Sequence, residues 1–101
     1  MTVLTKLGLG RDIPQLEGKE LRLQLTTYAP GAVGTPHSHE GKIEVVYLLS
    51  GSIIEHHQGG ADKVYQPGDA FFANRDTFHH LENKGSVPAQ LLVAMIVDKA
   101  P

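Results

Sequence analysis

The sequence predicts an all-β protein, a sandwich or a barrel, and two features of the chain support this prediction. Turn-forming residues recur at short intervals, and the segments between them have the length of β-strands. These segments are rich in β-branched residues or alternate apolar with polar side chains, and none of them continues as an amphipathic helix. Several short strands at such a spacing are typical of β-sandwiches and β-barrels.

The turn signals divide the chain into six segments with strand character. The turns are clusters of Pro, Gly, Asn and Asp, which lie at 29–31, 59–60, 66–69 and 83–88. The expected strands are 20–28, 43–49, 52–58, 69–73, 77–82 and 91–97. We detect no internal repeat and no linker, and the length of 101 residues predicts one domain over 1–101.

The first expected strand, 20–28, alternates in a way that predicts which face is buried. Leu21, Leu23 and Leu25 share one face, while polar side chains occupy the other. We expect the leucine face to point inward. Gln24 and Tyr28 would then lie on the solvent side, outside any pocket.

Two expected strands, 43–49 and 91–97, are apolar on both faces. In a small barrel the outer face of a strand normally meets water, so an apolar outer face needs a cover. A second sheet of the same chain or a second subunit would provide it. We expect a homodimer that buries this outer face.

Composition excludes several classes of function. The formal net charge is −2, from 9 basic and 11 acidic residues spread along the chain, which argues against nucleic acid or a membrane surface as partner. The absence of cysteine excludes disulfides, thiol catalysis and cysteine-type zinc sites. The N-terminus lacks the apolar core of a signal peptide, so we expect a cytoplasmic location. A periplasmic or secreted location stays open if a signal peptide has been removed.

Histidines are placed where they could converge inside such a barrel. His37 and His39 are two residues apart, so an extended chain sends both side chains to one face. Glu44 opens the next strand in the inward phase, and His79 shares the phase of its inward neighbours, whereas His80 has the opposite phase. Three imidazoles and one carboxylate suit a first-row divalent metal, and they leave coordination positions open for a substrate.

A simpler interpretation stands beside this one. A lone buried histidine is more often a hydrogen-bonded core residue than a ligand, and the short pattern "HSH" is by itself a weak motif. His56 and His57 flank a Gly-Gly turn and are expected to be solvated hairpin residues. His80 is expected at the surface or at a dimer contact, and it becomes the alternative ligand if a bulge shifts its strand.

The spacing of these residues resembles the two motifs of the cupins. The first, G-x5-H-x-H-x(3,4)-E-x6-G, is filled over 31–51 from Gly31 to Gly51. The second, G-x5-P-x-G-x2-H-x3-N, is matched in spacing over 68–83 from Gly68 to Asn83. Asn74 stands where the family usually has Pro, and Asp76 where it has Gly. Both Asn and Asp tolerate a left-handed turn, so we expect the turn to survive.

The resemblance implies a double-stranded β-helix, the jelly-roll cupin barrel, with one metal ion inside. It implies Fe, Mn, Ni, Zn or Cu as the ion, and as its ligands His37, His39, Glu44 and His79. It also implies a metal-dependent enzyme of oxygenase, isomerase or lyase type that acts on a small oxygen-bearing organic molecule. The alternative is a non-catalytic module that binds or senses a small ligand in the same cavity.

Overall fold

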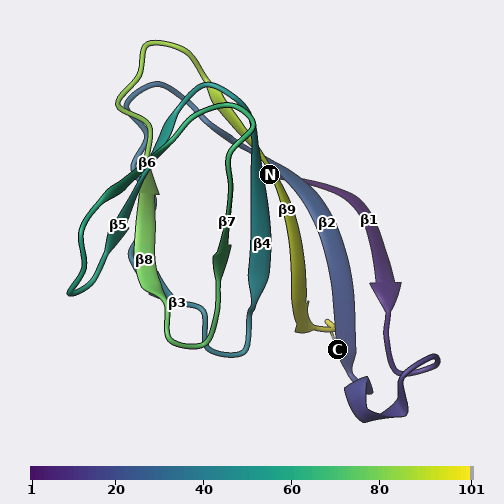
Figure 1. Ribbon diagram of the computed structural model, residues 1–101. Coiled ribbons are helices and arrows are strands. Elements are labelled where there is room, and N and C mark those ends of the chain that lie inside the picture. Colours follow the sequence, from purple (N-terminus) through teal and green to yellow (C-terminus); the bar gives the residue numbers. More distant parts are fainter. Residues whose placement is uncertain (101) are drawn as a thin grey trace.

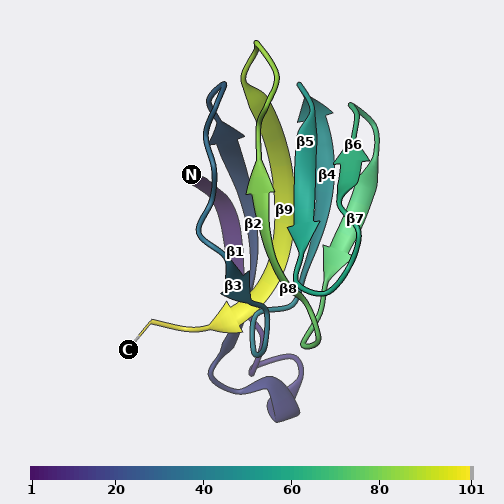
Figure 2. The ribbon, with the colours of Figure 1, turned by 90° about the vertical axis from the view of Figure 1, so that its left-hand side faces the viewer.

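The computed structural model describes residues 1–100, which form two antiparallel β-sheets facing each other (Figure 1). The five-stranded sheet has the order β1-β2-β9-β4-β7 and the four-stranded sheet the order β3-β8-β5-β6. Seen from the side, β5 and β8 lie in front of β4 and β9 (Figure 2). The strands are β1 (Thr2–Gly8), β2 (Lys19–Tyr28), β3 (His37–Ser38), β4 (Glu44–Ser50), β5 (Ile53–His57), β6 (Lys63–Tyr65), β7 (Ala70–Ala73), β8 (Phe78–Glu82) and β9 (Ala89–Asp98).

The all-β prediction is confirmed, and all six expected strands are present with ends that differ by no more than two residues. Three strands, β1, β3 and β6, were not predicted from the sequence, because they are either very short or solvent-exposed. Every residue of β1 is exposed at the edge of its sheet, while β3 has two residues and β6 has three. Strands of this kind carry little of the hydrophobic periodicity on which the prediction rests.

The hydrophobic core lies between the two sheets. The strands of both sheets contribute through alternate residues, as the period of two requires. The cluster consists of Val46, Leu48, Ile53, Leu81, Ala89, Leu91 and Val93, with Tyr28, Tyr65, Phe71 and Met95 packed against it. Gly51 closes the turn between β4 and β5 with a φ of 75°, where a Cβ would lie 2.5 Å from the carbonyl oxygen of Pro88. This turn therefore requires the glycine that ends the first motif.

The predicted phase of β2 is wrong. Leu21 is 40% exposed on the outer face of the five-stranded sheet, and Gln24 and Tyr28 line a cavity between the sheets. Alternation identifies the two faces of a strand, but it identifies the buried one only if the interior is apolar. Here this part of the interior is polar, because it adjoins a cluster of histidines.

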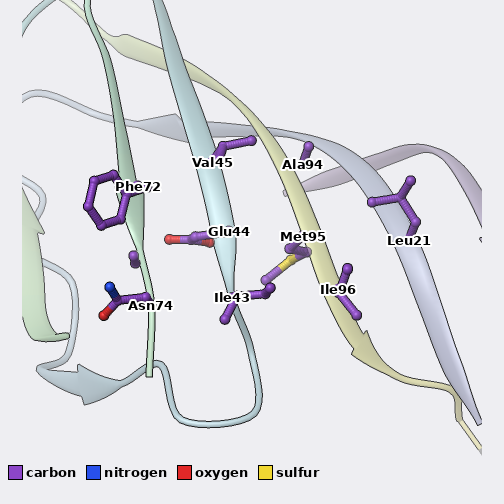
Figure 3. A pocket seen from close by; sticks show the side chains of 10 residues that line it. Leu21, Ile43, Glu44, Val45, Phe72, Asn74, Ala94, Met95 and Ile96 are labelled. Atoms are coloured by element: carbon purple, nitrogen blue, oxygen red, sulfur yellow. The ribbon is translucent and has the colours of Figure 1, made fainter. Parts of the chain in front are cut away.

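The outer face of the five-stranded sheet is apolar and exposed. A hollow of about 330 Å³ lies there, and Figure 3 shows the side chains that line it, most of them from β2, β4, β7 and β9. Val45 and Phe72 are paired across neighbouring strands and are 59% and 64% exposed. Within residues 1–100 neither sheet folds over this face. A second sheet of the described chain is therefore not its cover.

Candidate metal centre

His37, His39 and His79 converge between the sheets, and we call them the three-histidine cluster. His37 lies in β3 directly opposite His79 in β8, and His39 follows β3 on the same face. His39 Nε2 is 2.9 Å from His37 Nε2 and also 2.9 Å from His79 Nε2. His39 and His79 are buried, whereas His37 lies at the exposed mouth. The predicted convergence of these three residues is thus found.

The other ring nitrogen of each histidine, Nδ1, is hydrogen-bonded to an oxygen atom. His37 Nδ1 lies 2.7 Å from the carbonyl oxygen of Thr35, and His39 Nδ1 lies 2.7 Å from that of Lys42. His79 Nδ1 lies 2.6 Å from a carboxylate oxygen of Glu55. Since these acceptors carry no proton to give, each Nδ1 donates, and the neutral rings keep their lone pairs on Nε2.

The Nε2 lone pair of His39 therefore faces the Nε2 atoms of both His37 and His79 at 2.9 Å, and the neutral rings carry no proton on these nitrogens to join them. Such an arrangement needs a positive charge among the nitrogens. The spacing also fits one ion, because two nitrogens about 2.0–2.1 Å from a metal and at right angles to each other are about 3.0 Å apart. The residues present thus fit a divalent metal ion.

Glu44 borders the cluster without joining its closest group. Its Oε1 is 3.5 Å from His39 Nε2, and its side chain points inward from the first residue of β4, as expected. Burial raises the pKa of the Glu44 carboxyl; a positive charge on His79 opposes this shift, and the negative charge of Glu55 adds to it. Burial also lowers the pKa of His39, and the positive forms of His79 and His37 lower it further. Desolvation is thus the largest cause of both shifts, and it disfavours the charged form of each group.

Glu55 in β5 adjoins the cluster and was not predicted from the sequence. It is 1% exposed, and it accepts hydrogen bonds from His79 Nδ1 and from the Tyr65 hydroxyl at 2.8 Å. Burial alone would raise the pKa of this carboxyl, but the hydrogen bonds from His79 and Tyr65 outweigh it and lower the pKa. Its inward phase, two residues after the buried Ile53, was a signal that could have found it.

A cavity of about 280 Å³ adjoins the cluster. Gln24, Thr26 and Tyr28 line it on the β2 side, and the buried Oε1 of Gln24 has no hydrogen-bond partner among residues 1–100. Burial raises the pKa of the Tyr28 hydroxyl, and the Glu44 carboxylate raises it further. Lys42 and Glu44 line it beside the histidines, and the remaining wall is apolar, from Val46, Leu81, Leu91, Val93 and Met95. The cavity therefore combines a few polar groups with an apolar wall, as small-ligand sites do.

The turn that leads into His79 forms despite its two departures from the cupin pattern. Thr77 N donates to the carbonyl oxygen of Asn74 at 3.0 Å, and the Asn74 side chain accepts from Asp76 N at 2.9 Å. No residue other than glycine has a positive φ within residues 1–100, so the expected left-handed conformation at these two positions is not used. The turn is instead held by the side chain of Asn74.

Asn83, the last residue of the second motif, is fully buried and joins three segments. Its amide donates to the carbonyl oxygens of Tyr28 and Val87, each at 2.9 Å, and its side-chain oxygen accepts from Gly85 N at 2.8 Å. All of its polar atoms are thus satisfied. Asn83 serves the fold around the site and not the chemistry inside it.

The expectation for His56 and His57 is wrong, since both are partly buried and paired with acids. His56 lies 3.0 Å from Asp62 and 2.8 Å from Glu82, and its ring stacks on His80 at 4.5 Å. His57 Nε2 lies 3.2 Å from Glu55 Oε2. His80 points away from the cluster, as its phase predicts. β5 and β8 are paired in register from Ile54 to His57, which places carboxylates beside these rings.

Comparison with known proteins identifies the class to which this fold and cluster belong. Residues 24–95 match the sequence profile of a family described as "Cupin domain". That stretch is more than half of the chain and contains all four predicted ligands. The chain therefore belongs to the cupin family, and its two facing sheets are the double-stranded β-helix of that family.

Two relatives with similar sequences carry different names, and both are longer than this chain. Germin-like protein subfamily 2 member 1 from Arabidopsis thaliana is 33% identical over 81% of this chain and 39% of its own length. An oxalate-binding protein from Thermotoga maritima is 32% identical over 67% of this chain and 55% of its own length. The chain thus spans only about two fifths to a little over half of these relatives.

A solved structure extends the likeness in fold to nearly the whole chain. The crystal structure of a predicted oxalate decarboxylase from Thermotoga maritima superimposes with a TM-score of 0.66 at 23% identity, covering 96% of this chain and 93% of that one. At this identity the likeness establishes the fold alone. Among residues 1–100 there is no helix long and apolar enough to cross a membrane.

Proposed function

We propose that the protein binds one divalent first-row metal ion through His37, His39, His79 and Glu44. The observation that supports this most strongly is the convergence of three imidazole Nε2 atoms. In each of these rings Nδ1 already donates a hydrogen bond to an oxygen, so Nε2 keeps its lone pair. Neutral imidazole and carboxylate together suit Fe, Mn, Ni, Zn or Cu. Glu44, 3.5 Å from His39 Nε2, is the proposed fourth ligand.

The proposed reaction is that of a metal-dependent enzyme acting on a small oxygen-bearing organic molecule. A bound ion would supply Lewis-acid chemistry toward a substrate oxygen, or redox chemistry with dioxygen. The cavity of about 280 Å³ limits the substrate to a small molecule. The Oε1 of Gln24, which has no hydrogen-bond partner within residues 1–100, is available to accept a hydrogen bond from the substrate, and apolar side chains form part of the surrounding wall.

A non-catalytic function in the same cavity is the second candidate. It is favoured by the likeness to the protein named oxalate-binding, at 32% identity over two thirds of this chain. A small dicarboxylate held at the cluster would serve such a module without turnover. The two candidates share the site and differ only in whether the bound molecule is changed.

Metal analysis followed by a ligand screen tests the proposal. The protein, purified without added metal, is expected to carry about one first-row ion per chain. Small carboxylates, diketones and sugars are then screened under air and under nitrogen, with His79→Ala as the control without a complete cluster. Turnover with oxygen uptake supports an oxygenase, and turnover without it supports isomerase or lyase chemistry. Tight binding of oxalate with no turnover selects the binding module, and absence of any bound metal refutes the proposal.

We also propose that two copies of the chain associate through the outer face of the five-stranded sheet. This face carries exposed apolar side chains around the hollow in Figure 3, including Leu21, Val45 and Phe72. Contiguous apolar surface of this kind is costly to leave in water. A two-fold axis through the sheet would bury the same residues of both copies against each other.

A further inference from the structure

Glu55 is a buried acid that the proposed ligand set does not include. It lies in the middle of β5 with 1% of its surface exposed, beneath the three-histidine cluster. Its Oε2 accepts a hydrogen bond from His79 Nδ1 at 2.6 Å, and His57 Nε2 lies 3.2 Å from the same oxygen. Its Oε1 accepts from the Tyr65 hydroxyl at 2.8 Å. A buried carboxylate is costly unless such donors compensate for lost water.

The three histidines of the cluster are not equivalent, because their Nδ1 partners differ. Those of His37 and His39 are neutral backbone carbonyl oxygens, of Thr35 and Lys42. His79 alone in the cluster donates to a carboxylate. A hydrogen bond to an ionised acceptor is shorter and about twice as strong as one to a neutral acceptor. His79 is therefore the ring with the most firmly fixed tautomer and orientation.

The carboxylate itself is held in place from the opposite side. The Tyr65 ring stacks on Phe71 with centroids 4.2 Å apart, so its hydroxyl cannot swing away from Glu55 without losing that packing. The chain of contacts runs from this aromatic pair through Glu55 to His79 Nδ1 and ends at Nε2, in the cluster.

We propose that Glu55 is a positioning residue for the metal centre, acting through His79. Its hydrogen bond fixes His79 in the Nδ1–H tautomer, aims Nε2 at the ion and makes that nitrogen a stronger donor. This inference rests on the proposed metal function. It predicts that the charge of Glu55, and not its volume alone, sets the metal affinity.

The decisive variant is Glu55→Gln, which keeps the shape of the side chain and removes its charge. Its matched control is Glu82→Gln, because Glu82 also pairs with a histidine, His56 at 2.8 Å, on the outer face of the same sheet. Co²⁺ is the probe, with affinity measured by competition against a chromophoric chelator. Glu55→Gln is expected to raise the Kd about 10- to 100-fold, and Glu82→Gln to leave it within about twofold.

A spectroscopic readout separates positioning from a merely structural role. At saturating Co²⁺, the visible absorption spectrum of Glu55→Gln is expected to differ from that of the wild type, whereas the spectrum of Glu82→Gln superimposes on it. If Glu55→Gln does not fold by circular dichroism, Tyr65→Phe removes the other hydrogen bond of the carboxylate. Tyr65→Phe is expected to change the Kd and the spectrum in the same direction as Glu55→Gln does, but to a smaller extent.

The outcomes distinguish this inference from the function on which it rests. Wild-type protein that binds no Co²⁺ overturns the proposed metal function, and this inference with it. Wild-type binding, with Kd and spectrum unchanged in a folded Glu55→Gln variant, overturns the positioning role alone. A larger Kd with the altered spectrum in Glu55→Gln, and neither change in Glu82→Gln, supports it.

Discussion

His79 and His80 are adjacent in the chain, but they point to opposite faces of β8, and this difference is testable. His79 has its Nε2 in the three-histidine cluster, whereas His80 stacks on His56 away from it. His79→Ala should therefore weaken metal binding more than about 100-fold, since it deletes a proposed ligand outright. His80→Ala should bind as the wild type does. Isothermal titration with Zn²⁺ measures both.

Both variants must be shown to fold before they are compared, because His79 is fully buried and His80 is not, so substitution of His79 is the more disruptive change. Circular dichroism of both metal-free variants shows whether His79→Ala still folds, and His79→Gln replaces it if it does not. If His80→Ala lost the metal and His79→Ala kept it, the assignment of the ligand in β8 would be wrong.

The sequence allowed prediction of the cluster at the level of single residues because motif spacing fixes it. His37, His39 and His79 converge as expected, and Glu44 points inward beside them. Glu55 could not be predicted as their partner from spacing alone, because it belongs to neither motif. Its contact with His79 depends on the pairing of β5 with β8, and pairing is a property of the folded sheet.

At the scale of elements, strand existence was predictable but strand orientation was not always so. The leucine alternation of β2 correctly indicates a strand, and its faces are assigned the wrong way round. The reason is that Gln24 and Tyr28 line the cavity, while Leu21 lies on an outer face that is itself apolar. An alternating pattern identifies a strand and its two faces. Which face is buried depends on whether the interior and the outer surface beside the strand are polar or apolar.

His56 connects three elements and gives them a pH-dependent link. His56 lies on β5. One of its ring nitrogens contacts Asp62, which precedes β6, and the other contacts Glu82 of β8. The ring of His80 stacks on that of His56, and Lys84 Nζ lies 4.0 Å from Glu82 Oε1. Hydrogen bonds to Glu82, then to Asp62, raise the pKa of His56 above its usual value of about 6.5.

A raised pKa in the folded state means that the folded protein holds the proton more tightly than the unfolded chain does. The stabilisation is therefore fully present below about pH 6.5, and it is lost as the pH rises through the folded pKa. We expect the difference in free energy of unfolding between wild type and His56→Gln to shrink as the pH rises from about 6 to about 8.5.

Urea unfolding of chelator-treated protein at several pH values measures this difference without interference from metal. His80→Gln is the control, because it keeps both carboxylate contacts of His56. A difference that grew with pH, or that stayed level, would show that His56 is not held as an imidazolium by these acids.

At the scale of the whole molecule, the exposed outer face of the five-stranded sheet predicts assembly. Sedimentation at about 50 µM, well above the Kd of a stable interface, should show a homodimer. Val45→Glu places a charge in the proposed contact and should give a monomer. Val64→Glu is the matched control, since Val64 on β6 is also 59% exposed but belongs to the other sheet. A monomeric wild type, or equal effects of the two substitutions, would exclude this interface.

Metal, protons and stability are coupled through the cluster, which gives the last prediction. Metal binding requires neutral imidazoles, so it competes with protonation of His37, His39 and His79. In the metal-free protein burial lowers the pKa of His39, so the unfolded chain binds more protons at this residue than the folded protein does. The contribution of His39 to the stability of the metal-free protein therefore rises with pH through that window.

A bound ion acts in the same direction, because it stabilises only the folded protein and by more when its binding is tighter. Acidification from about pH 7.5 to about pH 5 should thus release the ion and shrink the difference in Tm between metal-loaded and chelator-treated protein. Differential scanning fluorimetry across this range measures that difference, with His79→Ala as the variant in which it should be small throughout. A difference that stayed constant between these pH values would mean that histidines do not hold the metal, since carboxylate ligands alone would keep it until well below pH 5.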